Sequence, residues 1–179
     1  MKKVVIISTS LRKNSNSDIL AKEFYNGAVD GGNEVEFISL VGKDIKYCKG
    51  CLSCQKTGKC VIYDDVTDIR EKIGNADVLV FATPIYYYEM SGQMKTLIDR
   101  LNPLYNSAYN FKEVYLIATA ADDDKSTFDG VLKGIEGFIY CYEKTSLKGK
   151  ILGYGLDGAG EVKDKLDLLK NAYEMGKKV

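Results

Sequence analysis

Short apolar runs alternate with amphipathic stretches along most of the chain. Five runs have the length and residue types of β-strands, and they cover Lys3–Ser8, Glu34–Leu40, Val78–Ala82, Val114–Thr119 and Ile151–Gly155. The first, third and fourth runs are apolar at almost every position, which is typical of strands covered on both faces. The pattern therefore predicts a parallel sheet with helices on both sides.

Between these runs, apolar residues recur every three or four positions, as they do on one face of an α-helix. In the stretch Ser17–Asp30, for example, Leu20, Phe24 and Ala28 are spaced four residues apart. The other predicted helices are Asp65–Ile73, Gly92–Leu104, Ser126–Tyr140 and Glu161–Lys178. Five strand–helix units of this size predict an α/β fold with a flavodoxin-like, doubly wound five-stranded parallel sheet of strand order 2-1-3-4-5.

The chain has 179 residues and no internal repeat or linker-like stretch, so we predict a single domain over residues 1–179. A segment at about residues 44–65 interrupts the alternation and carries four of the five cysteines, and we interpret it as an insertion loop. Ligands of doubly wound sheets bind beyond the carboxyl ends of the strands. The loops that follow the predicted strands are therefore the first candidates for a functional site.

The composition narrows the function further. Lysine plus arginine and aspartate plus glutamate both number 25, and this balance favours neither a nucleic acid nor a membrane as a partner. The chain contains no histidine, which excludes Ser-His, Cys-His and His-metal chemistry. The apolar run near the N-terminus, Val4–Ile7, is too short for a secretory signal or a membrane span, so we predict a cytoplasmic protein.

The loop after the first predicted strand, Ser8–Ser17, is rich in hydroxyl and amide side chains. It joins a strand end to a helix start, where unpaired backbone amides and the helix dipole favour phosphate. It lacks the glycines of a P-loop or of a dinucleotide-binding turn. We interpret it as a phosphate-binding loop, with an ordinary helix cap as the alternative. Its candidate ligands are Ser10, Arg12, Ser15, Asn16 and Ser17.

The loop after the third predicted strand, Thr83–Gly92, contains three consecutive tyrosines, Tyr86–Tyr88. The first and third strands flank the point where ligands bind in this topology. Tyrosine rings offer apolar area with a polar tip, so the loop predicts stacking on a planar cofactor. A tyrosine-rich dimer interface is the alternative, and the two interpretations are compatible.

These loops, together with Ser91–Lys95 and Asp99-Arg100, resemble the motifs of the NADPH-dependent FMN reductase family. Leu11 departs from the pattern, because relatives often have proline there. The resemblance implies that FMN places its phosphate on the first loop and its ring against the second, with a third loop after strand four at the ring's other edge. The implied cofactor-binding residues are Ser10, Arg12, Ser15, Asn16, Ser17, Thr83, Pro84, Ile85, Tyr86, Tyr87, Thr119, Ala120, Ala121 and Asp122.

The insertion loop carries cysteines with the spacing C-x2-C-x2-C-x5-C, at Cys48, Cys51, Cys54 and Cys60. Four local thiolates can surround a [4Fe–4S] cluster, and the run resembles the iron–sulfur flavoprotein subset of the family. Redox or free thiols and a zinc site are the alternatives. We interpret Cys141 as a packed or interface residue.

Together, these features predict an FMN-dependent NAD(P)H oxidoreductase that passes electrons through a cluster to an unidentified acceptor. The alternatives are an electron-carrier flavoprotein without nicotinamide turnover and a metal- or thiol-sensing protein. The thirteen tyrosines predict a homodimer or homotetramer. We also expect the insertion loop to lie at the carboxyl end of the sheet, with electrons crossing between one subunit's cluster and another's flavin.

Overall fold

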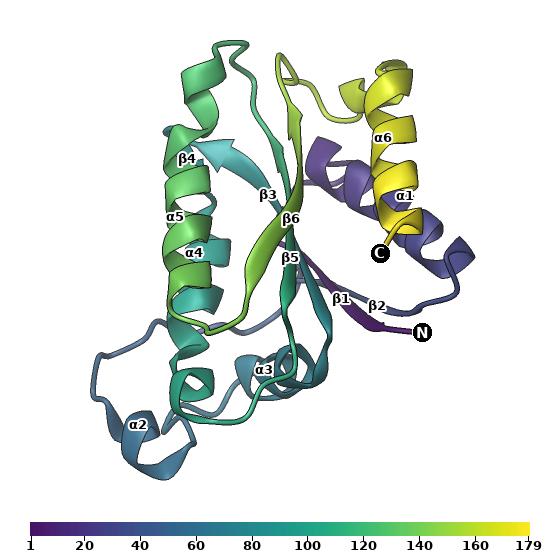
Figure 1. Ribbon diagram of the computed structural model, residues 1–179. Coiled ribbons are helices and arrows are strands. Elements are labelled where there is room, and N and C mark those ends of the chain that lie inside the picture. Colours follow the sequence, from purple (N-terminus) through teal and green to yellow (C-terminus); the bar gives the residue numbers. More distant parts are fainter.

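A twisted parallel sheet runs through the middle of the molecule and separates two groups of helices (Figure 1). The computed structural model describes residues 1–179. Its five parallel strands are β1 (Lys3–Ser8), β2 (Glu34–Ser39), β3 (Val78–Tyr86), β5 (Glu113–Thr119) and β6 (Ser146–Gly153). They lie in the order β2-β1-β3-β5-β6, which confirms the predicted topology. A two-residue strand, β4 (Glu89–Met90), pairs with β3 in the antiparallel direction and was not predicted.

Helices cover both faces of this sheet (Figure 1). One face carries α1 (Asn16–Asp30) and α6 (Leu166–Lys177), and the other carries α3 (Val66–Asn75), α4 (Gly92–Arg100) and α5 (Asp129–Tyr140). The short helix α2 (Ser53–Thr57) lies in the insertion loop, and 3-10 turns cover Asn102–Asn106, Lys125–Phe128 and Glu161–Asp164. None of the helices combines the length and the apolar character that crossing a membrane requires.

Each face of the sheet has its own hydrophobic core, with 25 buried residues on one side and 15 on the other. The central strand β3 contributes to both, because its side chains alternate between the faces. Leu79 and Phe81 join the larger core, whereas Val78, Val80 and Ala82 join the smaller one. This double burial is why the strand is apolar at successive positions.

Some boundaries differ from the predicted ones. The predicted helix Gly92–Leu104 ends as an α-helix at Arg100 and continues as a 3-10 turn that contains Pro103, because proline cannot donate the hydrogen bond that a helix interior needs. Strand β3 extends to Tyr86 because a tight turn of Tyr87 and Tyr88 folds the chain back into β4. The last predicted helix begins at Leu166, after the 3-10 turn.

Helices α1 and α6 pack unusually closely, and two glycines make this possible. A Cβ atom added at Gly176 would lie 2.1 Å from the carbonyl oxygen of Phe24. A Cβ atom at Gly27 would lie 1.9 Å from the carbonyl oxygen of Tyr173. The two backbones therefore touch directly, and any side chain at either position would force the helices apart.

We predict that Gly176→Ala lowers the free energy of unfolding by about 1–3 kcal/mol, because overpacking outweighs the better helix propensity of alanine. Chemical denaturation would measure the change. Gly137→Ala is the matched control: Gly137 lies in α5 with no atom within 4 Å of the added Cβ. The control should be neutral or stabilising by roughly 0.5–1 kcal/mol. Equal effects of the two substitutions would contradict the close helix contact.

Candidate functional site

The three loops proposed for the cofactor follow the adjacent strands β1, β3 and β5. The parallel register pairs Ser8 of β1 with Ala82 of β3, and Pro84 of β3 with Thr119 of β5. The carboxyl ends of these three adjacent strands are therefore nearly level. The loops that follow them meet at one edge of the sheet, which is the end where doubly wound folds bind their ligands.

The start of α1 has the features of a phosphate site. Ser15, Asn16 and Ser17 are buried, and none of the hydrogen bonds within the protein uses the backbone amides of Asn16, Ser17 or Asp18. The hydroxyl groups of Ser15 and Ser17 lie 3.0 Å apart. Buried amide donors at the positive end of a 15-residue helix favour an anion. This segment therefore fits the phosphate group of FMN.

The side chains of Asn16 and Arg12 contact the loop that follows β6. The Asn16 side chain donates to the carbonyl oxygen of Gly158 at 2.8 Å and accepts from the amide of Val162 at 3.1 Å. The Arg12 guanidinium is exposed and donates to the carbonyl oxygen of Asp157 at 2.7 Å. Asn16 thus holds the phosphate loop against the loop after β6. The guanidinium of Arg12 has further N–H groups that remain free to donate to a ligand. The Ser10 hydroxyl accepts from the amide of Arg12 at 3.3 Å.

A buried hydroxyl network joins the first and second loops. The Thr9 hydroxyl donates to the carbonyl oxygen of Ala82 and lies 3.0 Å from the hydroxyl of Ser91, which caps α4. The hydroxyl of Thr83 accepts from the amide of Ser91 at 3.0 Å and donates to the carbonyl oxygen of Pro84 at 2.9 Å. Thr83 is fully buried, so its hydroxyl positions the loop.

The tyrosines of the second loop are exposed at the end of the β3–β4 hairpin. Tyr87 is fully exposed, and Tyr86 and Tyr88 are about half exposed. The Tyr88 hydroxyl donates to the carboxylate of Asp122 at 3.3 Å, which links the hairpin to the third loop. The backbone amide of Asp124, together with this tyrosine and other donors, lowers the pKa of Asp122. Pro84 and Ile85 are half-buried, Thr119 and Ala120 are buried, and Ala121 and Asp122 are exposed.

Two cavities flank the phosphate loop. One has a volume of about 380 Å³ and lies between this loop, the side of α1 and the end of β2, with Arg12, Lys13 and Lys22 in its lining. The other has about 230 Å³ and is lined by Leu11, Tyr47 and the first turn of α4. A larger cavity of about 580 Å³ lies against β2 and α3, away from the three loops.

The four clustered cysteines surround one small cavity of about 20 Å³, which Ile62 and Asn102 also line. Cys54 is buried, Cys60 is half-buried, and Cys48 and Cys51 are exposed. Asn102 donates to the sulfur of Cys54 at 3.2 Å. The backbone amide and hydroxyl of Ser53 lower the pKa of Cys51. No three acidic or thiol side chains converge tightly enough to hold one metal ion.

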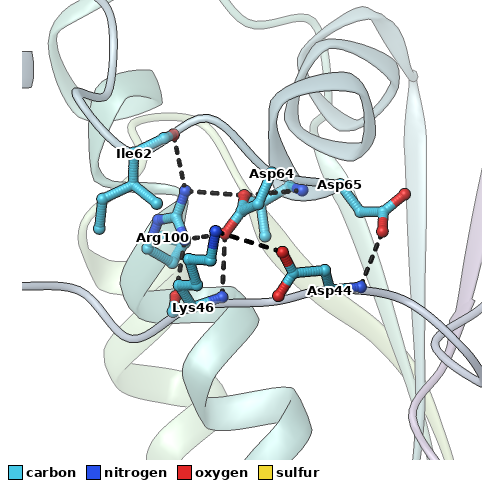
Figure 2. A network of polar contacts seen from close by, with 7 residues as sticks. Asp44, Lys46, Ile62, Asp64, Asp65 and Arg100 are labelled. Atoms are coloured by element: carbon cyan, nitrogen blue, oxygen red, sulfur yellow. Dashed lines mark hydrogen bonds and ion pairs between the residues drawn. The ribbon is translucent and has the colours of Figure 1, made fainter.

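The base of the cysteine loop is held by a buried ion pair (Figure 2). The Arg100 guanidinium, at the end of α4, binds both oxygens of the Asp64 carboxylate at 2.6 and 2.9 Å. It also donates to the carbonyl oxygens of Lys46 at 2.6 Å and Ile62 at 3.1 Å. The two arms of the loop are thus tied to each other and to α4. Asp65 adds a further tie by accepting from the amide of Asp44 at 2.7 Å.

This ion pair places the cysteines at the opposite end of the sheet from the one we predicted. Helix α4 begins just after its cap Ser91, whose hydroxyl lies beside Thr9 of the phosphate loop, and runs back along the strands to Arg100 (Figure 1). Helix α2 packs near the 3-10 turn that follows α4, at the amino end of the sheet. The insertion loop begins at the carboxyl end, where Tyr47 lines the cavity beside Leu11, but the expectation that its cysteines lie at this end was wrong. Nine helical residues, roughly 14 Å, separate the two sites along α4.

Comparison with known proteins identifies the family of this chain. The family model for NADPH-dependent FMN reductase matches residues 2–127, which is more than half of the chain. This chain belongs to the NADPH-dependent FMN reductase family. The resemblance inferred from the sequence motifs is confirmed, and the matched region contains all three loops and the cysteines.

The relatives of this chain include proteins named iron-sulfur flavoproteins and a protein named as an oxidoreductase. An iron-sulfur flavoprotein of Methanocaldococcus jannaschii is 42% identical over 102 residues, which cover 57% of this chain and 53% of that protein. A Bacillus subtilis protein named as an NAD(P)H-dependent FMN-containing oxidoreductase is 30% identical over 161 residues, covering 86% and 85%. The chain spans about half the length of the iron-sulfur flavoproteins it matches first, 53% and 46%.

Solved structures support the fold of this FMN reductase family chain. An NAD(P)H:quinone oxidoreductase from Methanothermobacter marburgensis superposes with a TM-score of 0.74 and 16% identity, covering 99% of this chain and 96% of that one. At this level of identity, the similarity establishes the shared fold alone.

Sequence reasoning missed several residues that shape the site. Thr9 and Ser91 hold the first two loops together, and Tyr88 bonds Asp122 across to the third. Asp64 and Arg100 stood out only as members of motifs, because their pairing joins residues 36 positions apart. A family motif that places an arginine near the end of a helix was the one available signal for this pair.

The buried ion pair generates a prediction about pH. Burial raises the pKa of Asp64, but the hydrogen bonds and charge of Arg100, with the amides of Lys46 and Val66, lower it below its ordinary value. A carboxyl group with a lowered pKa in the folded protein loses its stabilising contribution as the pH falls through that folded value. We therefore expect the free energy of unfolding to decrease below about pH 4.

Replacing the pair by Asp64→Asn/Arg100→Gln should make this loss shallower between about pH 4 and 2, as measured by chemical denaturation at each pH. Asp99→Asn is the control, because Asp99 forms an exposed ion pair with Lys95 and should leave the pH profile nearly unchanged. An unaltered acid profile in the double variant would assign the acid sensitivity to other carboxylates.

Proposed function

We propose that this chain is an FMN-dependent NAD(P)H oxidoreductase, a flavin reductase-like flavoprotein. The observation that carries the proposal is the buried start of α1, where the amides of Asn16, Ser17 and Asp18 have no acceptor within the protein. This anion site stands level with two loops that offer tyrosine rings and small side chains. The relative named as an NAD(P)H-dependent FMN-containing oxidoreductase supports a nicotinamide as the electron donor.

Bound FMN would supply the redox chemistry, which is hydride uptake from a nicotinamide and electron transfer to an acceptor. The protein residues bind and orient it. The α1 amides and Arg12 hold the phosphate, and the Thr9–Ser91 network keeps the first two loops at a fixed separation. The Tyr88–Asp122 hydrogen bond fixes the third loop relative to the hairpin. None of these binding and positioning roles needs a histidine, and the chain contains none.

The proposal includes a [4Fe–4S] cluster held by Cys48, Cys51, Cys54 and Cys60. The donor set fits this group, because four thiols line one cavity, and Gly50 and Gly58 have positive φ angles that permit tight turns around it. The names of several relatives, iron-sulfur flavoproteins, support the same assignment. A cysteine site of this kind needs a reducing compartment, so the proposal includes a cytoplasmic location.

A homodimer or homotetramer completes the proposal. Two exposed apolar surfaces lie at opposite ends of the sheet: the tyrosines of the hairpin, and Leu52, Val61 and Tyr63 of the cysteine loop. Under a two-fold axis, the cysteine loop of one subunit can face the hairpin of the other, and the contact is made twice. This arrangement brings one subunit's cysteine site toward the other's flavin site, whereas within one subunit α4 separates the two sites by roughly 14 Å along its axis.

We predict that Arg12→Ala weakens FMN binding about 10- to 100-fold, because a hydrogen bond to a charged group contributes roughly 1.5–3 kcal/mol. Fluorescence titration would measure the affinity. Lys13→Ala removes the adjacent exposed cation and is the control, with a much smaller effect expected. NADPH added without oxygen should bleach the flavin absorbance of the FMN-loaded wild type. Bound FMN that NADPH fails to reduce would favour an electron carrier, and absent FMN binding would refute the proposal.

Iron reconstitution tests the cysteine assignment. Protein treated with iron and sulfide without oxygen should bind about four irons per chain, measured by metal analysis and absorption. Cys54→Ala should lose the iron while keeping FMN. Cys141→Ala removes an exposed cysteine outside the cluster of four, and this variant should keep both the iron and FMN. Wild type that takes up no iron would refute the cluster and leave the flavin proposal intact.

The assembly has its own test. Light scattering at micromolar concentration should give at least twice the chain mass of 19.9 kDa. Tyr63→Lys, in the cysteine loop, should weaken the assembly, whereas Tyr140→Lys at the end of α5 should not, although both tyrosines are more than four-fifths exposed, at 85% and 92%. A monomeric wild type would contradict the proposed dimer.

A further inference from the structure

The β3–β4 hairpin rests on α5, and the helix carries glycine at both points of contact (Figure 1). A Cβ atom added at Gly130, in the first turn of α5, would lie 2.3 Å from the carbonyl oxygen of Tyr88. One helical turn further on, a Cβ atom added at Gly134 would lie 2.5 Å from the terminal methyl group of Met90. The hairpin therefore approaches the helix more closely than any other residue type would allow at these positions.

The two glycines face different kinds of atom. Met90 could swing its methyl group away from a side chain at position 134, because methionine has three rotatable bonds. The carbonyl oxygen of Tyr88 cannot move alone, since it belongs to the backbone of the turn between β3 and β4. A Cβ atom at position 130 would therefore push the hairpin backbone outward by roughly 1 Å before ordinary contact distances were restored.

Tyr88 is held at two points by one segment of the chain. Its carbonyl oxygen rests against Gly130, and its hydroxyl group donates to the carboxylate of Asp122 at 3.3 Å. Both partners belong to the segment that follows β5 and leads into α5. The hairpin and the third loop are thereby joined into one unit, and the contact at Gly130 determines how closely the two approach each other.

We propose that Gly130 is a positioning residue of the flavin site, where the absence of a side chain lets the tyrosine hairpin lie at the correct distance from the third loop. The inference rests on the FMN site proposed above. The residues predicted to contact the flavin ring lie in these two loops, whereas the phosphate contacts come from the start of α1, on the other face of the sheet. A side chain at position 130 should therefore change how the ring is held and leave the phosphate contacts intact.

The test compares FMN binding by wild type, Gly130→Ala, Gly134→Ala and Gly137→Ala. All three glycines lie in α5, and a Cβ atom at Gly137 meets no atom within 4 Å, so this variant controls for helix propensity. Gly130→Ala should weaken FMN binding about 2- to 10-fold, as expected for one impaired aromatic contact. It should also raise the fluorescence of bound FMN, because a tyrosine ring that moves away from a flavin quenches its emission less. The other two variants should stay close to wild type.

Inorganic phosphate, added as a competitor of FMN, reports on the phosphate site alone. Its inhibition constant should be the same in Gly130→Ala as in wild type. Tyr88→Phe approaches the same unit from its other anchor: it removes the hydrogen bond to Asp122, keeps the ring and leaves α5 unchanged. It should shift the fluorescence of bound FMN in the same direction as Gly130→Ala.

The outcomes separate this inference from the proposed function. If wild type binds FMN and Gly130→Ala matches Gly137→Ala in affinity and fluorescence, Gly130 only packs the helix and the inference is wrong. An equal loss in Gly134→Ala, or a weaker phosphate competition in Gly130→Ala, would also overturn it. If Gly130→Ala does not fold, as judged by circular dichroism, Tyr88→Phe decides the question, and a wild-type fluorescence in that variant counts against the inference. Wild type that binds no FMN refutes the flavin site itself.

Discussion

The pairing of β3 with both β1 and β5 determines where the chemistry of this protein can take place. In parallel strands, register fixes how far each strand projects, and here the ends of three neighbouring strands are nearly level. The phosphate loop, the tyrosine hairpin and the third loop are consequently assembled at one edge without any direct contact between their sequences. The buried hydroxyl groups of Thr9 and Ser91 then lock the first two loops together.

The second site obeys a different constraint. Nothing in the sheet dictates where an insertion of about twenty residues should go after β2. The direction is set by a buried ion pair, in which Arg100 collects Asp64 and two backbone carbonyl oxygens from both arms of the loop. Helix α4 thus borders a candidate site at each end: its cap bonds the loop after β1, and its last residue anchors the cysteine loop. The two sites share one rigid element but face opposite ends of the molecule.

Much of the architecture could be predicted because double burial leaves a strong signal. A strand such as β3 needs apolar residues at successive positions, and these runs gave the sheet and its order. The segment Ser8–Ser17 stood out as a candidate phosphate loop because it is polar and joins a strand to a helix, and that assignment stays a prediction. The path of the cysteine loop could not be predicted, because it depends on a contact between residues 36 positions apart. The internal role of the Asn16 side chain was hidden for the same reason.

The turn between β3 and β4 carries a consequence of a different kind. Two-residue hairpin turns favour asparagine and glycine because both positions adopt a left-handed conformation. Here they are Tyr87 and Tyr88, with φ angles of 52° and 64°. Bulky residues in this conformation are strained, and one of the two rings is wholly in solvent. The hairpin therefore combines a strained backbone with exposed aromatic rings, so replacing the two tyrosines by asparagine and glycine would relieve the strain and remove both rings at once.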